Sequence, residues 1–416
     1  MRIAFFSPHS DPLARPGEPD SGGQCVYEAR LAEALAGMGY PVRDYTRLAA
    51  GKPVAEAIAP HADIRRFPMG PEGFLRKEEM GPHLAEFSRH VLADDRTWLA
   101  ETDIFHGHYW DGGVAALEAS LALGKPLVFT SHSLGMLKRD GLPDNSLYHY
   151  DVRIPAETRV MRAADAVIAL SSIEKEALTD RYGISAENIH IVPGGVEVQK
   201  RVPSMSKAEH KAKLGIESDL MVFAVGRLDA RKGFLEWIDA MPAVARAVAA
   251  AGRSVCFMMP KGPKEPSEEE TGLLRRLQQK ARELEVEEHI HWFHRLSDDE
   301  LYHAYCAADL FVCPSLYEPF GLVLVEAMAA GTPVVATCFG GPVDIVEPGR
   351  DGFLADPRDN NAWSDSVLKV LLASPAERQA LNEAALAKAR RYSWDAVATE
   401  IGRVYAQTLQ AYRRFD

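Results

Sequence analysis

The sequence predicts an α/β protein made of two doubly wound parallel sheets. Short apolar runs of strand length alternate with amphipathic segments of helix length. This alternation stops in a polar stretch before residue 207 and then starts again, which indicates a linker between two halves. The 416 residues also suit two domains of about 200 residues each better than one. We therefore expect one domain over residues 1–196, a second over 207–392, and a last helix over 396–416 that packs back on the first domain.

Composition excludes several classes of protein. The net charge of −12 argues against a surface that binds nucleic acid. Five cysteines without a C-x-x-C spacing favour free thiols in a reducing compartment, not a disulfide framework or a zinc site. The first residues predict a buried strand instead of a signal peptide, and apolar runs stay shorter than the ~18 residues of a membrane span. We expect a cytoplasmic protein without a membrane span.

The elements follow from these patterns in order. In the first half, apolar runs predict strands at 2–7, 42–48, 65–68, 103–108, 126–131, 166–170 and 189–192. Helices are predicted at 25–38, from within 74–87, and near 148–164. In the second half, strands are predicted at 220–225, 254–259, 289–293 and 310–313. Helices are predicted at 234–248, 273–284, 297–307, 322–330, 363–372, 375–391 and 396–412, with a mobile polar loop at 260–271.

The segment 314–326 joins a strand, a turn and a helix in a way that suits a nucleotide. The backbone amides around Phe320, Gly321 and Leu322 open the helix, so they direct donors and a positive dipole end at a ligand. Glu326 follows one turn later on the same side of the helix. A phosphate at the helix start and a ribose diol near Glu326 fit this layout. The alternative is an ordinary strand–turn–helix with solvated glutamates.

A second candidate for phosphate binding follows the first strand of the second half. Arg227 and Lys232 are five positions apart in one loop, so both can reach one diphosphate. The alternative is a basic surface loop without a ligand, and Arg231 remains without an assigned role.

The first half offers weaker candidates. A Gly22-Gly23 pair before a helix indicates either a phosphate loop or a plain tight turn. His106 and His108 share one face of a strand, but a metal site would need further ligands, and none is near in sequence. Tyr109 and Asp111 follow that strand in what we expect to be a loop at the carboxyl edge of the sheet, where open α/β folds bind ligands.

Several motifs resemble those of one enzyme family. Glu318-Pro-Phe-Gly with Glu326, followed by Gly340-Gly341-Pro342, resembles the donor-binding signature of retaining GT-B glycosyltransferases. Gly226-Arg227-Leu with Lys232-Gly233, Gly22-Gly23-Gln24, and His132-Ser-Leu-Gly with Lys138 are similar to the branch that contains sucrose-phosphate, mannosylfructose-phosphate and sucrose synthases. The resemblance covers nearly the whole chain.

The resemblance implies a fold and a set of roles. It implies two Rossmann-like domains with the active site in the cleft between them. The implied catalytic residues are Arg227, Lys232, Glu318 and His132. The implied donor-binding residues are Gly23, Arg295, Leu296, Phe320, Gly321, Leu322 and Glu326. The implied acceptor-binding residues are Gln24, Lys77, Tyr109, Asp111, Lys138 and Arg153, although Lys77 could also lie on a solvated surface helix.

The resemblance also implies a reaction. We expect a retaining transfer of a hexosyl group from a nucleotide sugar to fructose 6-phosphate, with UDP-glucose favoured over GDP-mannose and with no metal or cofactor. His294-Arg295 replaces a glycine found in many relatives, and Ile154-Pro155 follows Arg153, so base recognition and the register of the acceptor site stay open. Three alternatives remain: a transferase with a glycan or lipid-linked acceptor, a sucrose synthase-like enzyme using free fructose, and a nucleotide-sugar-binding protein or phosphorylase.

Overall fold

The computed structural model describes the chain except for residues 15–21, 74, 142–148 and 414–416. Contacts between Cα atoms divide the chain into two compact units. The first unit contains Met1–Gly194 and Trp394–Asp416, and the second contains Gly195–Ser393. The stretch predicted as a linker therefore belongs to the second unit, where it includes the short 3₁₀ helix Val198–Lys200 (η4). No helix among the described residues is long and apolar enough to cross a membrane.

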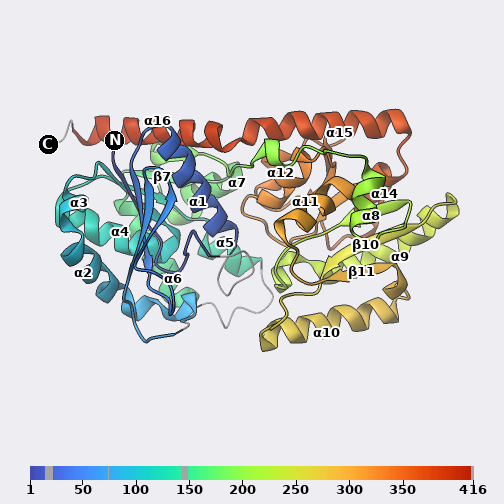
Figure 1. The fold of residues 1–416 in the computed structure, drawn as a ribbon, viewed down its shortest axis with the longest axis horizontal. Helices are drawn as coiled ribbons and strands as arrows, with labels where there is room; N and C mark the ends of the chain where they lie inside the picture. Colours follow the sequence, from blue (N-terminus) through green and yellow to red (C-terminus); the bar gives the residue numbers. More distant parts are fainter. Residues whose placement is uncertain (15–21, 74, 142–148, 414–416) are drawn as a thin grey trace. The chain divides into compact units, whose positions relative to one another are not determined.

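The first unit is built on an eight-stranded sheet (Figure 1), in the order β3-β4-β2-β1-β5-β6-β7-β8. Its strands are Ile3–Phe6 (β1), Val42–Arg47 (β2), Ala55–Ala59 (β3), Ala62–Phe67 (β4), Ile104–His108 (β5), Leu127–Thr130 (β6), Ala166–Ala169 (β7) and Ile189–Ile191 (β8). All pairs are parallel except β3 with β4. The central strands β1, β5, β6 and β7 are buried along their whole length. This burial explains the apolar runs of β1, β6 and β7, whereas β5 also buries His106 and His108.

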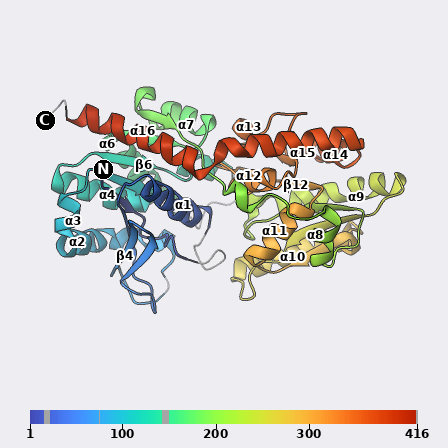
Figure 2. The same ribbon diagram turned by 45° about the horizontal axis from the view of Figure 1, so that its top comes forward.

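Helices cover this sheet, and one of them comes from the end of the chain. They are Gly23–Gly37 (α1), Leu84–Asp94 (α2), Arg96–Ala100 (α3), Tyr109–Leu123 (α4), Gly135–Asp140 (α5), Tyr150–Ala163 (α6), Ser172–Tyr182 (α7) and Trp394–Tyr412 (α16). Figure 2 shows α16, in red, beside α1, in dark blue, and the two helices are in contact. The ring of Trp394 at the start of α16 packs edge-on against Tyr27 of α1.

The second unit contains a six-stranded sheet in which every pair is parallel, in the order β11-β10-β9-β12-β13-β14. Its strands are Leu220–Phe223 (β9), Val255–Pro260 (β10), Ile290–Phe293 (β11), Leu310–Cys313 (β12), Val334–Thr337 (β13) and Gly352–Ala355 (β14). Its helices are Lys207–Lys213 (α8), Phe234–Ala250 (α9), Glu268–Glu283 (α10), Asp298–Ala307 (α11), Leu322–Ala329 (α12), Pro342–Ile345 (α13), Asn360–Leu371 (α14) and Pro375–Ala389 (α15). The predicted α/β fold class with two parallel-sheet domains is confirmed.

Two local predictions were wrong, whereas the helix predicted to start within 74–87 does begin there, at Leu84. The 3₁₀ turns Lys77–Glu79 and Gly81–His83 precede it, because Gly81-Pro82 does not favour a continuous helix. The polar loop expected after His108 is the first turn of α4, which begins at Tyr109. The loop expected over 260–271 ends early, because Ser267 and Glu270 form a capping box that starts α10.

Candidate active site

The candidate donor residues of the second unit lie at one edge of its sheet. Arg227 and Lys232 follow β9, Arg295 and Leu296 follow β11, and the Glu318 segment follows β12. Since all these strands are parallel, their carboxyl ends meet at the same edge. Arg227 and Arg295 are exposed there, and Leu296 is half-buried.

Lys232 and Glu318 form a largely buried ion pair at this edge. The Lys232 Nζ lies 2.7 Å from Glu318 Oε2, and the Ser315 hydroxyl donates to the same oxygen at 3.0 Å. Burial alone would raise the pKa of the Glu318 carboxyl, but the charges of Lys232 and Arg231 and these hydrogen bonds lower it below its ordinary value. Glu318 is therefore an anion fixed in orientation, suited to accept hydrogen bonds from sugar hydroxyls.

Two glycines allow the backbone segments of this edge to approach closely. Gly233 has φ +66°, and a Cβ atom there would lie 1.8 Å from the Pro314 carbonyl oxygen. Gly340 has φ +98°, and its Cβ would lie 2.0 Å from the Glu318 carbonyl oxygen, which also accepts the Gly341 amide at 2.8 Å. The glycines that follow Lys232 and β13 thus hold the Glu318 segment from both sides.

Helix α12 begins directly after this segment. Gly321 is its N-cap, Leu322 its first residue, and the side chain of Phe320 is buried just before it. The first turn therefore presents the positive end of the helix dipole at the sheet edge that carries Arg227 and Lys232. Arg231, which had no predicted role, donates to the Tyr317 carbonyl at 2.7 Å and so supports the same segment.

Glu326 lies one turn into α12 and already has two partners. Its Oε2 accepts the Tyr305 hydroxyl at 2.7 Å, and its Oε1 lies 3.4 Å from Nη2 of Arg201. The Glu326 side chain keeps 20% of its surface exposed. Neither Arg201 nor Tyr305 was predicted, because they belong to no motif that indicates a ligand site.

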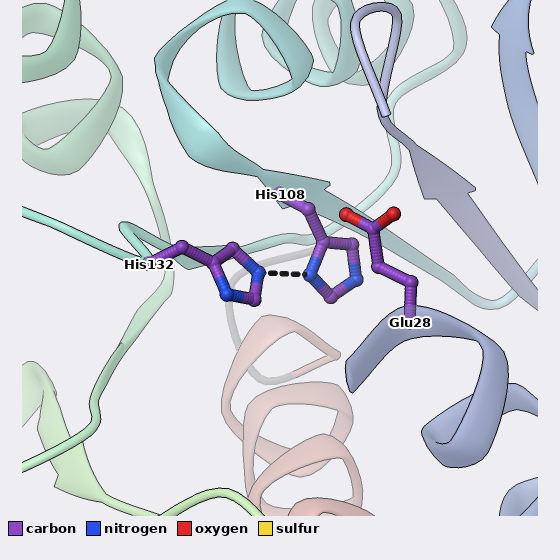
Figure 3. Close-up of side chains that lie close together, drawn as sticks. All are labelled: Glu28, His108 and His132. Atoms are coloured by element: carbon purple, nitrogen blue, oxygen red, sulfur yellow. Dashed lines mark hydrogen bonds between the residues drawn. The ribbon is translucent and has the colours of Figure 1, made fainter. Parts of the chain in front are cut away.

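In the first unit, His132 belongs to a buried cluster. Figure 3 shows Glu28 from α1, His108 from the end of β5, and His132 from the segment after β6. Nδ1 of His108 and Nε2 of His132 are 2.9 Å apart and share one hydrogen bond. Burial lowers the pKa of both imidazoles well below the ordinary value, and the neighbouring His106 adds to the effect. Both rings are therefore neutral at physiological pH.

The sequence argued against a metal site because no further ligand lies near the histidines along the chain, and this cluster shows that reason to be incomplete. A third ligand-capable group is present, because Glu28 places a carboxylate oxygen within 4.8 Å of nitrogens of both histidines. It was missed because it lies far from them in sequence. Its oxygens, however, already accept hydrogen bonds from Ser7, Ser10 and Gln24. The two neutral histidine rings therefore hydrogen-bond to each other, and the Glu28 carboxylate hydrogen-bonds to polar side chains, without need of a metal ion. Gln24, a predicted acceptor-binding residue, is one of these side chains and hydrogen-bonds to Glu28. Gly23, a predicted donor-binding residue, is exposed.

Lys77, Tyr109 and Arg153 come together in one small pocket. Its other lining residues are Glu78, Trp110, His149 and Val152. Lys138, predicted to share this site, lies on α5 and is not part of the lining. The Arg153 guanidinium is buried and donates to Glu157, to the Tyr109 hydroxyl at 2.9 Å, and to Ser133.

Asp111 occupies a different position from the one expected. It is fully buried in the first turn of α4, and both of its oxygens lie within 3.0 Å of Nδ1 of His9. His9 in turn packs against the Tyr109 ring, with centroids 4.7 Å apart. Asp111 thus reaches the surroundings of the pocket through His9, a residue in a polar loop that no motif singled out.

Backbone strain concentrates near these first-unit residues. Among the described residues other than glycine, five have a positive φ, and three of these are Tyr109, His132 and His149. Such conformations cost free energy and are typical of functional sites.

Comparisons with known proteins show the family to which the chain belongs. Residues 206–388 match the family model described as Glycosyl transferases group 1, and residues 21–200 match Glycosyltransferase Family 4. A D-inositol 3-phosphate glycosyltransferase of Actinosynnema mirum is 33% identical over 99% of this chain and 98% of its own. The chain belongs to the GT-B glycosyltransferases.

Other relatives of this glycosyltransferase include proteins of the branch that the motifs indicated. A mannosylfructose-phosphate synthase of Agrobacterium fabrum is 32% identical over 88% of this chain and 83% of its own. The structure of a sucrose-phosphate synthase from Thermosynechococcus elongatus superposes with a TM-score of 0.88, at 29% identity over 99% of both chains. The resemblance read from the motifs is confirmed.

Proposed function

We propose that this glycosyltransferase moves a hexosyl group from a nucleotide sugar to a sugar phosphate, with fructose 6-phosphate as the favoured acceptor. One observation carries the proposal: Lys77, Tyr109 and Arg153, from three separate segments, line one pocket of the first unit. Lys77 supplies a positive charge near Glu78, and Arg153 donates a hydrogen bond to the Tyr109 hydroxyl. A phosphate dianion suits such a pocket better than a neutral hydroxyl does.

The donor half of the proposal uses the second unit. Arg227, Lys232 and the first amides of α12 stabilise the charge that develops on the departing diphosphate. The bond between the anomeric carbon and the diphosphate oxygen breaks, and a bond to the acceptor oxygen forms on the same face, so the configuration is retained. The departing phosphate accepts the proton of the acceptor hydroxyl. Glu318 and His132 hold the transferred sugar, and the basic groups replace a metal ion.

UDP-glucose remains the favoured donor and GDP-mannose the second. The names of two relatives each specify a disaccharide phosphate as the product, and one of these names specifies a mannosyl group. Arg295 and Leu296 follow β11, where base recognition is expected, and their side chains do not favour one base over the other on charge alone.

A second acceptor has specific support. Several relatives at 30–33% identity are named D-inositol 3-phosphate glycosyltransferases. Inositol 3-phosphate and the ring form of fructose 6-phosphate each carry several hydroxyl groups and one phosphate, so the same pocket chemistry applies to both.

Nucleotide release from UDP-glucose and GDP-mannose tests the proposal against five acceptors: fructose, fructose 6-phosphate, glucose 6-phosphate, inositol 3-phosphate and water. We expect turnover with a phosphorylated acceptor and little with free fructose. The Lys77→Ala variant should raise the KM of the phosphorylated acceptor about tenfold or more, as expected when a charged hydrogen bond is lost. Lys125→Ala is the matched control, because Lys125 precedes β6 at the opposite edge of the same sheet.

Equal rates with fructose and its phosphate would contradict the phosphate pocket, and an unchanged KM in Lys77→Ala would misplace it. Two further measurements address the chemistry. Activity should persist in excess EDTA, and NMR of the early product should show the anomeric configuration of the donor.

A further inference from the structure

The search for a further functional residue leads to Arg201, which precedes α8 in the polar stretch first interpreted as a linker. The surrounding backbone is attached to α11. The Tyr302 hydroxyl donates to the Val202 carbonyl at 3.1 Å and accepts the Ser204 amide at 2.9 Å. The Cys306 thiol approaches the carbonyl of Arg201 itself at 3.6 Å. The backbone around Arg201 is thus held by α11, without any contribution from the Arg201 side chain.

The Arg201 side chain lies over the edge of the donor site. Its guanidinium carbon is 5.3 Å from the centroid of the Tyr305 ring, and its Nη2 is 3.4 Å from Glu326 Oε1. The charge of Glu326 raises the pKa of Arg201 although burial alone would lower it. Only 18% of the side chain is exposed, so solvent screens this pair weakly.

Tyr305, over whose ring the Arg201 guanidinium lies, is the second partner of Glu326. Its ring is fully buried between Phe223 and Phe311, with centroid distances of 5.3 and 5.7 Å, and its hydroxyl donates to Glu326 Oε2. The two oxygens of Glu326 therefore each have one partner, and together these partners fix the plane of the carboxylate. An ionised carboxylate has about four lone-pair positions, so acceptor capacity remains for two further donors on its exposed side.

We propose that Arg201 is a positioning residue of the nucleotide site, which holds the Glu326 carboxylate in the orientation that accepts both hydroxyls of the donor ribose. This inference rests on the proposed nucleotide-sugar donor. It assigns a ligand-directed role to a residue outside the signature segment. Its consequence is that Arg201 contributes to nucleotide affinity through the ribose hydroxyls and not through the base or the diphosphate.

The test compares ribose and dideoxyribose ligands. Dissociation constants are measured by calorimetry for UDP, GDP and their 2′,3′-dideoxy analogues with the unmodified protein and with Glu326→Ala, Arg201→Ala and Arg201→Lys. We expect the unmodified protein to bind the ribose form at least about tenfold more tightly than the dideoxy form, since hydrogen bonds to a charged group are lost. Glu326→Ala should abolish this preference, Arg201→Ala should reduce it at least about threefold, and Arg201→Lys should fall between.

The controls separate the possible failures. Arg350→Ala removes an exposed arginine that pairs with Glu347, and it should leave the preference unchanged. If Arg201→Ala weakens ribose and dideoxy ligands equally, or keeps the full preference, the positioning role is wrong while the donor site stands. If neither diphosphate binds the unmodified protein, the proposed function fails and this inference with it. Thermal unfolding of each variant shows whether it is folded.

Discussion

Among single residues, Lys232 and Glu318 make the most testable contribution to both stability and chemistry. Glu318 is 8% exposed, so its charge depends on the lysine at 2.7 Å. Lys232→Met should lower the free energy of unfolding by about 2–4 kcal/mol, because a buried carboxylate loses its cation. Urea unfolding measures this loss.

A double variant shows whether that loss comes from the pair. The double variant Lys232→Met with Glu318→Gln should recover a large part of the lost free energy of unfolding, since no unpaired charge remains. Neither the single nor the double variant should be active. Lys280→Met is the control, because Lys280 and Asp239 are each about one-third exposed, and such pairs contribute about 0–1 kcal/mol. A double variant no more stable than the single one would assign the loss to packing.

His106 makes stability depend on pH. It is fully buried, its ring nitrogens bond to the hydroxyls of Tyr405 and Thr130, and burial lowers its pKa to about 3. Below the unfolded pKa near 6.5, the unfolded chain takes up a proton that the folded state refuses, so stability falls as the pH falls. Between pH 6 and 4 the unmodified protein should lose about 1.4 kcal/mol per pH unit more than His106→Asn does.

Denaturant unfolding at several pH values measures this difference. His61→Asn is a suitable control, since His61 is exposed and asparagine tolerates its positive φ. Parallel pH curves for the unmodified protein and His106→Asn would contradict the effect.

At the scale of elements, the turn after β13 supports the Glu318 segment through contacts between backbone atoms. Gly340→Ala should lower the free energy of unfolding by about 2–5 kcal/mol, because a strained φ adds to a clash with the Glu318 carbonyl. Activity should fall with it, because the Glu318 carboxylate moves. Gly349→Ala separates the two causes: its φ of +80° is similar, but no atom lies within 4 Å of the added Cβ. That control should cost only about 1–2 kcal/mol. Equal losses at both positions would remove the argument from close approach.

Burial explains only part of which strands were predicted from the sequence, because β13 is also buried along its whole length and was not predicted. Strands such as β9 and β12 are buried along their whole length and appear as short apolar runs. Strand β3 escaped prediction because it is an antiparallel edge strand with exposed alanines and one glutamate, so it has no apolar periodicity. The early start of α10 did have a signal, Ser267 three residues before Glu270, but the prolines of that segment outweighed it.

Some residues of the candidate site could be predicted from the sequence and others could not. Arg227, Lys232, Glu318 and Glu326 follow strand ends, so a parallel sheet brings them to one edge whatever their separation in sequence. Arg201 and His9 could not be found this way, because each acts through a partner more than a hundred positions away. Asp111 was found but misplaced, since a polar segment that opens a helix has the same composition as a loop.

At the scale of the whole molecule, the first unit is discontinuous and the second is not. Residues 195–393 form one continuous segment, whereas residues 1–194 are completed by the segment that contains α16. We expect the fragment 195–393 to unfold cooperatively on its own. The fragment 1–194 should lack a cooperative transition, because β5 loses the Tyr405 hydroxyl and α1 loses Trp394. Adding a peptide of residues 394–416 should restore the transition, as followed by circular dichroism.

The return of α16 to the first unit also affects synthesis on the ribosome. The chain emerges from its amino end, so residues 1–194 must wait for the 199 residues of 195–393 before their last helix is made. At roughly 5–20 residues per second, this delay lasts about 10–40 s. During that time the side of α1 that α16 later covers is open to chaperones and to neighbouring nascent chains. The second unit is therefore complete before the first, although its residues are translated later. The first unit, whose translation begins first, is the last to gain all of its residues.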